Sequence, residues 1–215
     1  MKKYYLLYLF LIFSFFSISF ADNSLDEKKE FIIKGEKNFL YDYEPINLDG
    51  SVNAVIEIPT GTNDKWEVSD SGEYIEHEIK NSKPRKIKYL SYPTNYGFIP
   101  KTKLGLEING DGDALDILVL GPSIPRGQII KVKILGMIEI IDDNFINHKV
   151  IAIPKNSNFL NVNSLDDIKK NYPGILEIIE IWFKNYKGAF LEIRDYRGKK
   201  NTLNFINKVT IKNDN

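Results

Sequence analysis

The sequence predicts an α+β fold that is mainly β, a small barrel of short strands flanked by C-terminal helices. Seven short apolar runs rich in β-branched residues lie between positions 54 and 153. Gly or Pro separates most of them, as expected for strands joined by tight turns. Helical periodicity begins only after Ser164. With 215 residues, 43% of them apolar, the chain is long enough for one domain with a sizeable core.

The N-terminus has the pattern of a secretory signal peptide. Two lysines precede an apolar run from Tyr4 to Phe20, and small residues including Ala21 precede a polar stretch. An uncleaved membrane anchor is the competing interpretation, but the run is slightly short for a span. We therefore expect residues 1–21 to be removed near Ala21, giving an exported protein, periplasmic or secreted, without a stable membrane span.

The body of the chain follows an N-terminal arm. Residues 22–50 carry aromatic and charged side chains without a clear period, and we expect them to pack onto a domain spanning residues 51–215. The predicted strands of that domain are Ala54–Ile58, Lys65–Val68, Tyr74–Ile79, Ile117–Leu120, Ile129–Leu135, Met137–Ile141 and Lys149–Ile153.

Three helical signals follow the strands. Ser164 with Asp167 three residues later resembles a helix-opening cap. An apolar stripe at helical spacing comprises Ile175, Ile178, Ile179, Trp182, Phe183 and Tyr186. A last helix is predicted over Leu203–Val209, where apolar residues recur every third position.

Composition excludes several classes of protein. Lys+Arg and Asp+Glu both number 29, so the chain has no overall charge with which to attract nucleic acid, and no nucleic-acid partner is expected. The absence of Cys excludes disulfides, thiol catalysis and cysteine-ligated zinc. His77 and His148 are interpreted as surface histidines.

The most informative segment is DGDALD at positions 111–116, which brings three carboxylates into one loop before an apolar run. Like charges this close repel one another, so Asp111, Asp113 and Asp116 favour a bound cation. Oxygen ligands without Cys or His indicate Mg²⁺, Mn²⁺ or Ca²⁺. A calcium loop of the EF-hand type needs Glu at its twelfth position, and neither Leu120 nor Pro122 supplies it. A magnesium cluster for phosphoryl chemistry is the remaining interpretation.

Four further segments accompany this cluster in order: VIEIP at 55–59, KWE at 65–67, YPTNYGFIP at 92–100, and the Tyr186–Lys187 pair. With DGDALDILVLG they closely resemble the soluble family I inorganic pyrophosphatases over residues 51–187. The resemblance implies a five-stranded barrel of the oligonucleotide-binding (OB) type with flanking helices. It also implies Mg²⁺-dependent hydrolysis of pyrophosphate to two phosphates, with several ions bound, and a homo-oligomer.

The resemblance also assigns roles to individual residues. Asp113 would take the proton from the attacking water, with Tyr96 as the second catalytic residue. The metal ligands would be Asp111, Asp113, Asp116, Asp142, Glu57 and Asn147. Substrate oxygens would be held by Lys65, Arg85, Tyr96, Lys149, Tyr186 and Lys187, with Glu67 and Tyr92 in support. Tyr92 and Tyr96 could instead be barrel packing, Lys65 an exposed strand residue, and Lys83, Lys86 or Lys88 the true ligand in place of Arg85.

Asn147 departs from the family pattern, which has an aspartate at this position. An amide offers one neutral oxygen where a carboxylate offers a charged pair, so metal binding should be weaker unless Asp143 or His148 takes its place. Two alternatives to pyrophosphate hydrolysis stay open. One is an exported metal-binding or phosphate-binding barrel whose catalysis is impaired through Asn147. The other is a hydrolase of nucleotide polyphosphates, for which no base-binding wall is identified.

Overall fold

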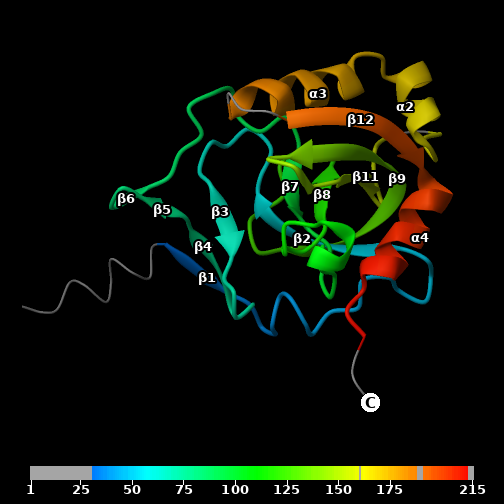
Figure 1. Ribbon diagram of the computed structural model, residues 1–215. Helices are drawn as coiled ribbons and strands as arrows, with labels where there is room; N and C mark the ends of the chain where they lie inside the picture. The colour runs from blue at the N-terminus through cyan, green and yellow to red at the C-terminus, as the bar shows by residue number, and fades with distance from the viewer. Residues whose placement is uncertain (1–30, 160, 188–190, 213–215) are drawn as a thin grey trace, which may run out of the picture. The chain divides into compact units, whose positions relative to one another are not determined.

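The computed structural model describes residues 31–159, 161–187 and 191–212. The expected signal peptide and the first part of the arm lie outside these residues. Five strands of the described part pair in a ring, β2–β7–β8–β11–β9, and β9 pairs again with β2 (Figure 1). These strands are β2 (Val52–Ile58), β7 (Asn95–Phe98), β8 (Asp116–Val119), β11 (Lys149–Pro154) and β9 (Ile129–Asp142).

Smaller elements extend this ring. The short β10 (Phe145–Ile146) and the longer β12 (Leu191–Gly198) both pair antiparallel with β9. A separate three-stranded sheet has the order β1 (Ile32–Lys34), β4 (Tyr74–His77), β3 (Trp66–Val68). The arm therefore contributes β1 to this sheet, and its Phe39 is buried. A two-stranded ribbon joins β5 (Ile79–Lys80) to β6 (Lys83–Pro84), and a 3-10 turn, η1, covers Leu106–Ile108.

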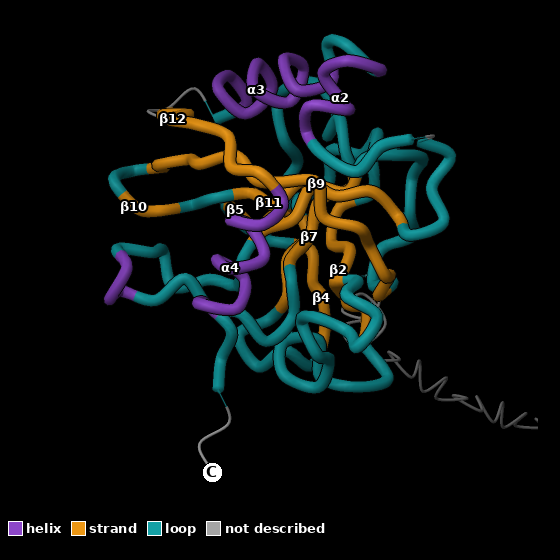
Figure 2. The backbone as a smooth tube through the Cα atoms, turned by 90° about the vertical axis from the view of Figure 1, so that its right-hand side faces the viewer, coloured by secondary structure: helices purple, strands orange, loops and turns teal. Residues whose placement is uncertain are grey.

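Three α-helices lie in the described C-terminal part, so the prediction of a mainly β fold with C-terminal helices is confirmed. Helix α2 (Leu165–Asn171) begins with the predicted cap, because the Ser164 hydroxyl accepts a hydrogen bond from the Asp167 amide at 3.1 Å. The others are α3 (Ile175–Tyr186) and α4 (Lys199–Val209). Helices α2 and α3 lie together above the strands, whereas α4 lies apart from them (Figure 2). No helix among the described residues is long and apolar enough to cross a membrane.

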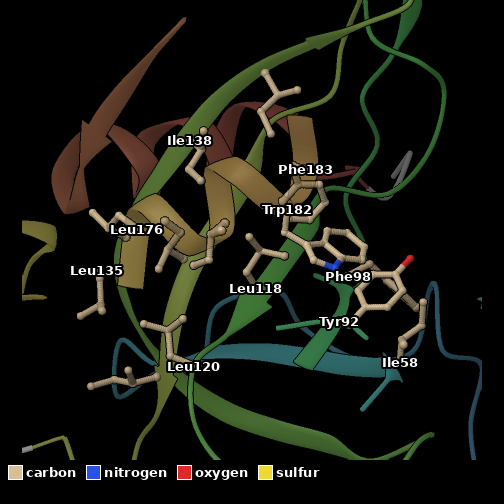
Figure 3. Close-up of a cluster of buried hydrophobic side chains, with 14 of the residues drawn as sticks. Ile58, Tyr92, Phe98, Leu118, Leu120, Leu135, Ile138, Leu176, Trp182 and Phe183 are labelled. Carbon is tan, nitrogen blue, oxygen red and sulfur yellow. The ribbon is translucent and has the colours of Figure 1, made fainter. Parts of the chain in front are cut away.

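Alternation along the ring strands divides the core into two clusters. Val55, Leu118 and Ile151 face the cluster that contains α2 and α3, while their neighbours face the cluster that contains Ile206 and Val209 of α4. Figure 3 shows the first cluster, where Trp182 and Phe183 of α3 lie among strand residues that include Leu118 and Phe98. The stripe predicted for α3 is wrong at Ile178, which is 57% exposed, because Leu176 occupies the buried face instead.

One predicted turn is also wrong. Strand β9 runs unbroken through Gly136, where the sequence suggested a break between two strands. A Cβ at this position would lie 2.4 Å from the Arg197 carbonyl oxygen and 2.5 Å from a Leu165 methyl carbon. Gly136 therefore allows β12 and α2 to approach β9 closely, which is a packing role that sequence pattern alone does not distinguish from a turn.

Candidate active site

A cavity of about 1030 Å³ opens at one end of the ring. The parallel strands β8 and β11 both begin there, with Asp116 and Lys149 as register partners, and the antiparallel β9 ends there at Asp142. All fourteen residues predicted for the site line this cavity: Glu57, Lys65, Glu67, Arg85, Tyr92, Tyr96, Asp111, Asp113, Asp116, Asp142, Asn147, Lys149, Tyr186 and Lys187. Segments spread over 131 positions of the chain, from Glu57 to Lys187, are thus brought to one place.

The acidic loop owes its shape to its backbone. Gly112 adopts φ +93°, a left-handed conformation that favours glycine, so the glycine between the two aspartates is required by the turn. The Leu104 amide donates to the Asp113 carbonyl at 2.7 Å, and the Gly112 amide donates to the Leu104 carbonyl at 2.8 Å. The Asp113 amide donates to the Asp111 carboxylate at 3.1 Å. The loop therefore holds both carboxylates against the start of β8.

Three carboxyl groups of the cavity, those of Asp111, Asp113 and Glu57, have raised pKa values. Burial raises the pKa of Asp111 to about 6, and the Asp113 and Asp116 charges add to the effect. Burial and the Asp116 charge also raise the pKa of Asp113. Burial raises the pKa of Glu57 to about 8, although the Lys65 charge and a hydrogen bond from the Val68 amide oppose it. Their ionised forms are therefore destabilised in this cavity, and a nearby cation would relieve that.

Lysines already partner some of these carboxylates. The Lys149 ammonium donates to Asp116 at 2.5 Å and also to the Asn147 side-chain oxygen. Lys187 donates to Asp142. Within the described part of the chain, the other Asp142 carboxylate oxygen is buried and has no hydrogen-bond partner. Two carboxylates predicted to bind metal, Asp116 and Asp142, are thus paired with lysines predicted to bind phosphate. Among the described residues, one buried oxygen of Asp142 remains without a partner.

The donor set fits a hard divalent cation. Its members offer carboxylate and amide oxygens, which such cations prefer, and the unpartnered Asp142 oxygen is an open acceptor at the cavity wall. Among the described residues, no three His, Cys, Asp or Glu side chains already lie in the arrangement of a metal site. A cation would be held by Asp111, Asp116 and Asp142 after their carboxylates turn from their present partners.

Tyrosines and α3 form the apolar wall of the cavity. The Tyr92 and Tyr96 rings lie 5.5 Å apart, and Tyr186 stacks on Trp182 at 4.5 Å with an angle of 11° between the rings. Burial raises the pKa of all three tyrosine hydroxyls, so they stay neutral donors. The Lys149 ammonium lies 5.6 Å from the centre of the Tyr96 ring. Tyr92 and Tyr96 therefore both pack and line the cavity, and the two interpretations offered by the sequence do not exclude each other.

The sequence left open whether Arg85 or one of three nearby lysines lies at the substrate site, and the structure shows where each of them lies. Arg85 lines the cavity, whereas Lys83, Lys86 and Lys88 are absent from its lining and Lys86 pairs with Asp64. The Arg85 guanidinium donates to the Glu78 carboxylate at 2.6 Å. Of the four cations, Arg85 is thus the one placed to meet a ligand.

Both histidines are buried, so the interpretation of them as surface residues is wrong. His77 packs between Trp66 and Phe31, and His148 hydrogen-bonds the Ile140 backbone in β9. Burial lowers the pKa of His148. His148 and Asp143 do not line the cavity, whereas Asn147 does. Neither of the two therefore takes the place of Asn147 in the lining of the cavity.

The cavity has a part that the sequence did not reveal. Its lining includes Asp70, Tyr74, Glu76, Lys103 and Tyr41. The Asp70 charge contributes to the raised pKa of Asp113. Asp70 lies three residues after the KWE segment, and this short spacing is the only signal in the sequence that could have indicated it.

Without divalent ions, the folded protein is expected to lose stability as the pH rises, and Glu57→Gln is expected to reduce that loss. Glu57 titrates near 4.5 when unfolded and near 8 when folded. Between these values the unfolded state binds fewer protons, so rising pH favours unfolding. Thermal unfolding of both proteins between about pH 5 and about pH 8 measures the difference. Parallel curves for wild type and variant would contradict the assignment to Glu57.

Comparison with known proteins agrees with this geometry. Residues 54–213 match the family model described as inorganic pyrophosphatase. The mitochondrial inorganic pyrophosphatase of Saccharomyces cerevisiae is 31% identical over 206 residues, covering 82% of this chain and 66% of the relative. A probable inorganic pyrophosphatase of Plasmodium falciparum is 33% identical over 196 residues, covering 78% of this chain and 51% of the relative.

Solved structures show the same fold. The inorganic pyrophosphatase of Schistosoma japonicum superposes with a TM-score of 0.75 at 27% identity, covering 80% of this chain and 70% of that one. This chain spans between half and two thirds of the length of the two curated relatives. The match of the family model to most of the chain, together with the site geometry, shows that the chain belongs to the soluble family I inorganic pyrophosphatases.

Proposed function

We propose that this protein hydrolyses inorganic pyrophosphate to two orthophosphates with Mg²⁺ as its cofactor. The observation that carries the proposal is the single cavity in which oxygen ligands, cations and neutral hydroxyl donors meet. Pyrophosphate is a small, highly charged anion, so its hydrolysis needs charge neutralisation on both halves and one water held in line. Family membership supports the same reaction.

The chain's own residues would divide this work. Asp113, whose side chain is exposed to the cavity, would accept the proton of the attacking water, and its raised pKa makes it a better base than an ordinary carboxylate. Arg85 can hold two phosphate oxygens at once, whereas Lys65 and Lys149 act as point charges. The Tyr96 hydroxyl, kept neutral by burial, would donate to a substrate oxygen. Bound Mg²⁺ would lower the pKa of a coordinated water and neutralise phosphate charge.

Phosphate release from the purified protein tests the proposal. We expect orthophosphate from pyrophosphate in the presence of Mg²⁺, and little from ATP under the same conditions. Binding of pyrophosphate without release would favour the metal-binding or phosphate-binding barrel, which the family comparison does not favour. Equal release from ATP would favour a hydrolase of nucleotide polyphosphates.

Asn147→Asp is expected to lower the Mg²⁺ concentration needed for half-maximal activity. Asn147 lines the cavity and binds the Lys149 ammonium through its side-chain oxygen, so a carboxylate there adds an anionic oxygen beside Asp116. We expect a shift of about tenfold, similar to the effect of outer-shell partners on metal affinity. A magnesium titration of activity, with calorimetric Mg²⁺ binding as a second measurement, gives the shift.

Asn144→Asp is the matched control for this prediction, since it adds the same charge on the neighbouring turn and does not line the cavity. Its activation curve should follow that of the wild type. Identical curves for Asn147→Asp and wild type would remove the argument from Asn147.

Export and assembly are further proposals. Cleavage near Ala21 would release an exported protein, and N-terminal sequencing of the secreted or periplasmic form identifies the new terminus. A homo-oligomer is expected from the family, and light scattering of the purified protein measures its mass.

A further inference from the structure

His77 is a buried side chain for which the proposed reaction gives no role. It lies at the end of β4 and is 6% exposed. Its ring stacks on Trp66, the register partner on β3, with centroids 5.0 Å apart and an angle of 19° between the rings. Phe31 approaches it at 5.9 Å. The imidazole therefore has little freedom to move.

The restrained ring is aimed at the backbone of Arg85. His77 Nε2 lies 2.9 Å from the Arg85 carbonyl oxygen. A carbonyl oxygen only accepts hydrogen bonds, so Nε2 carries the proton and donates. The same carbonyl also accepts from the Lys65 amide at 3.0 Å. One oxygen thus joins the segments that carry two of the cavity's cations, Lys65 and Arg85.

The rest of the contact network restrains Arg85 further. The Arg85 amide donates to the Glu78 carbonyl at 2.7 Å, and the Glu78 amide donates to the Lys65 carbonyl at 2.9 Å. The Glu78 carboxylate accepts from the Arg85 guanidinium at 2.6 Å. Arg85 lies just after the β5–β6 ribbon, which pairs with no other described strand. His77 provides a side-chain donor that ties the Arg85 carbonyl to the sheet of β3 and β4.

The stack of His77 on Trp66 is also connected to Glu57, one of the predicted metal ligands. The Arg126 guanidinium lies 4.1 Å from the Trp66 ring, and it donates to the Glu57 carbonyl oxygen at 2.7 Å. The column Arg126, Trp66, His77 therefore connects β2, where Glu57 lies, with the segment of Arg85.

We infer that His77 is a positioning residue for phosphate binding, which holds Arg85 in place by donating from Nε2 to its carbonyl oxygen. The inference rests on the proposed function, because Arg85 is taken to bind substrate oxygens. His77 itself does not line the cavity and touches no substrate.

A double-mutant cycle with Arg85 tests the inference. His77→Phe keeps an aromatic ring on Trp66 but removes the donor, and we expect KM for pyrophosphate to rise roughly threefold to tenfold, with a much smaller change in kcat. His77→Gln keeps a side-chain N–H and should recover part of the loss. In an Arg85→Ala background, His77→Phe should change KM no further. An undiminished rise in that background would overturn the inference.

Two measurements separate this inference from the proposed reaction. If the wild type releases no phosphate, the dissociation constant of imidodiphosphate, a non-hydrolysable analogue, replaces KM in the same cycle. In that case the proposed hydrolysis is refuted, but the coupling between His77 and Arg85 can still be measured from the dissociation constants. A wild type that binds no analogue would overturn both.

The tautomer of His77 gives a direct reading that needs no variant. Long-range ¹H–¹⁵N NMR of the wild type should show the proton on Nε2. A neutral ring with its proton on Nδ1 would overturn the inference even if every variant failed to fold.

Discussion

Asp113→Asn is expected to lower kcat for pyrophosphate hydrolysis by about 10²–10⁴-fold, the usual contribution of a general base. The amide has nearly the same shape as the carboxylate but cannot accept the proton of the attacking water. The fold should survive, because the loop is held through the Asp113 backbone and, within the described residues, no hydrogen bond to its side chain is found. Steady-state kinetics and thermal unfolding together measure the two effects.

Asp143→Asn is the matched control. Asp143 is exposed on the turn after β9, has φ 49°, and does not line the cavity, so asparagine fits its left-handed backbone. Its kcat should equal that of the wild type. If Asp113→Asn kept the full rate, another group would have to accept the proton.

Lys149→Met is expected to reduce both activity and stability. Lys149 is 4% exposed, and its removal leaves Asp116 beside the Asn147 oxygen without its cation. Breaking a buried ion pair from one side costs about 3–5 kcal/mol, and we expect about 3 kcal/mol here because the Asp116 side chain keeps some solvent contact. The loss of a phosphate-binding charge should lower kcat/KM by about 10²-fold or more.

Magnesium should reverse part of the stability loss. Asp116 released from its lysine is a better cation ligand, so Mg²⁺ should raise the melting temperature of Lys149→Met more than that of the wild type. Lys155→Met is the control, because Lys155 pairs with Asp49 at 2.6 Å in an exposed position. Its melting temperature should stay unchanged. An equal loss of stability in the two variants would contradict the role of burial at Lys149.

The acidic loop of the site could be predicted from the sequence because its chemistry is local, whereas the other site residues were predicted from the resemblance to the family. DGDALD carries its own electrostatic argument, since three carboxylates in one loop repel one another and so favour a bound cation. Asn147 could be located by aligning the segment around Lys149 and Pro154 with the family pattern. The sequence could not predict that Arg85, rather than a neighbouring lysine, lines the cavity. This depends on which side chain of the segment turns toward the cavity.

Packing relations were the part that the sequence left open. Gly136 looked like a turn because its pattern does not show that β12 and α2 will approach from outside. Strand β12 is not predicted because a bulge between Ile193 and Asp195 interrupts its alternation, and Leu191, Ile193 and Tyr196 meet the first core cluster only in the folded protein. The sequence does not show that His77 is buried, because the ring of Trp66 and the carbonyl of Arg85 meet it only in the folded sheet.

The ring of strands has a consequence for how ligand binding spreads through the molecule. Each ring strand contributes to the cavity wall: Glu57 from β2, Tyr96 from β7, Asp116 from β8, Asp142 from β9 and Lys149 from β11. The ring itself closes through the pairing of residues 52–55 of β2 with residues 129–132 of β9. A phosphate analogue bound in the cavity would therefore oppose opening of all five strands at once. In hydrogen–deuterium exchange, amide protection should rise along all five strands together, as one cooperative unit.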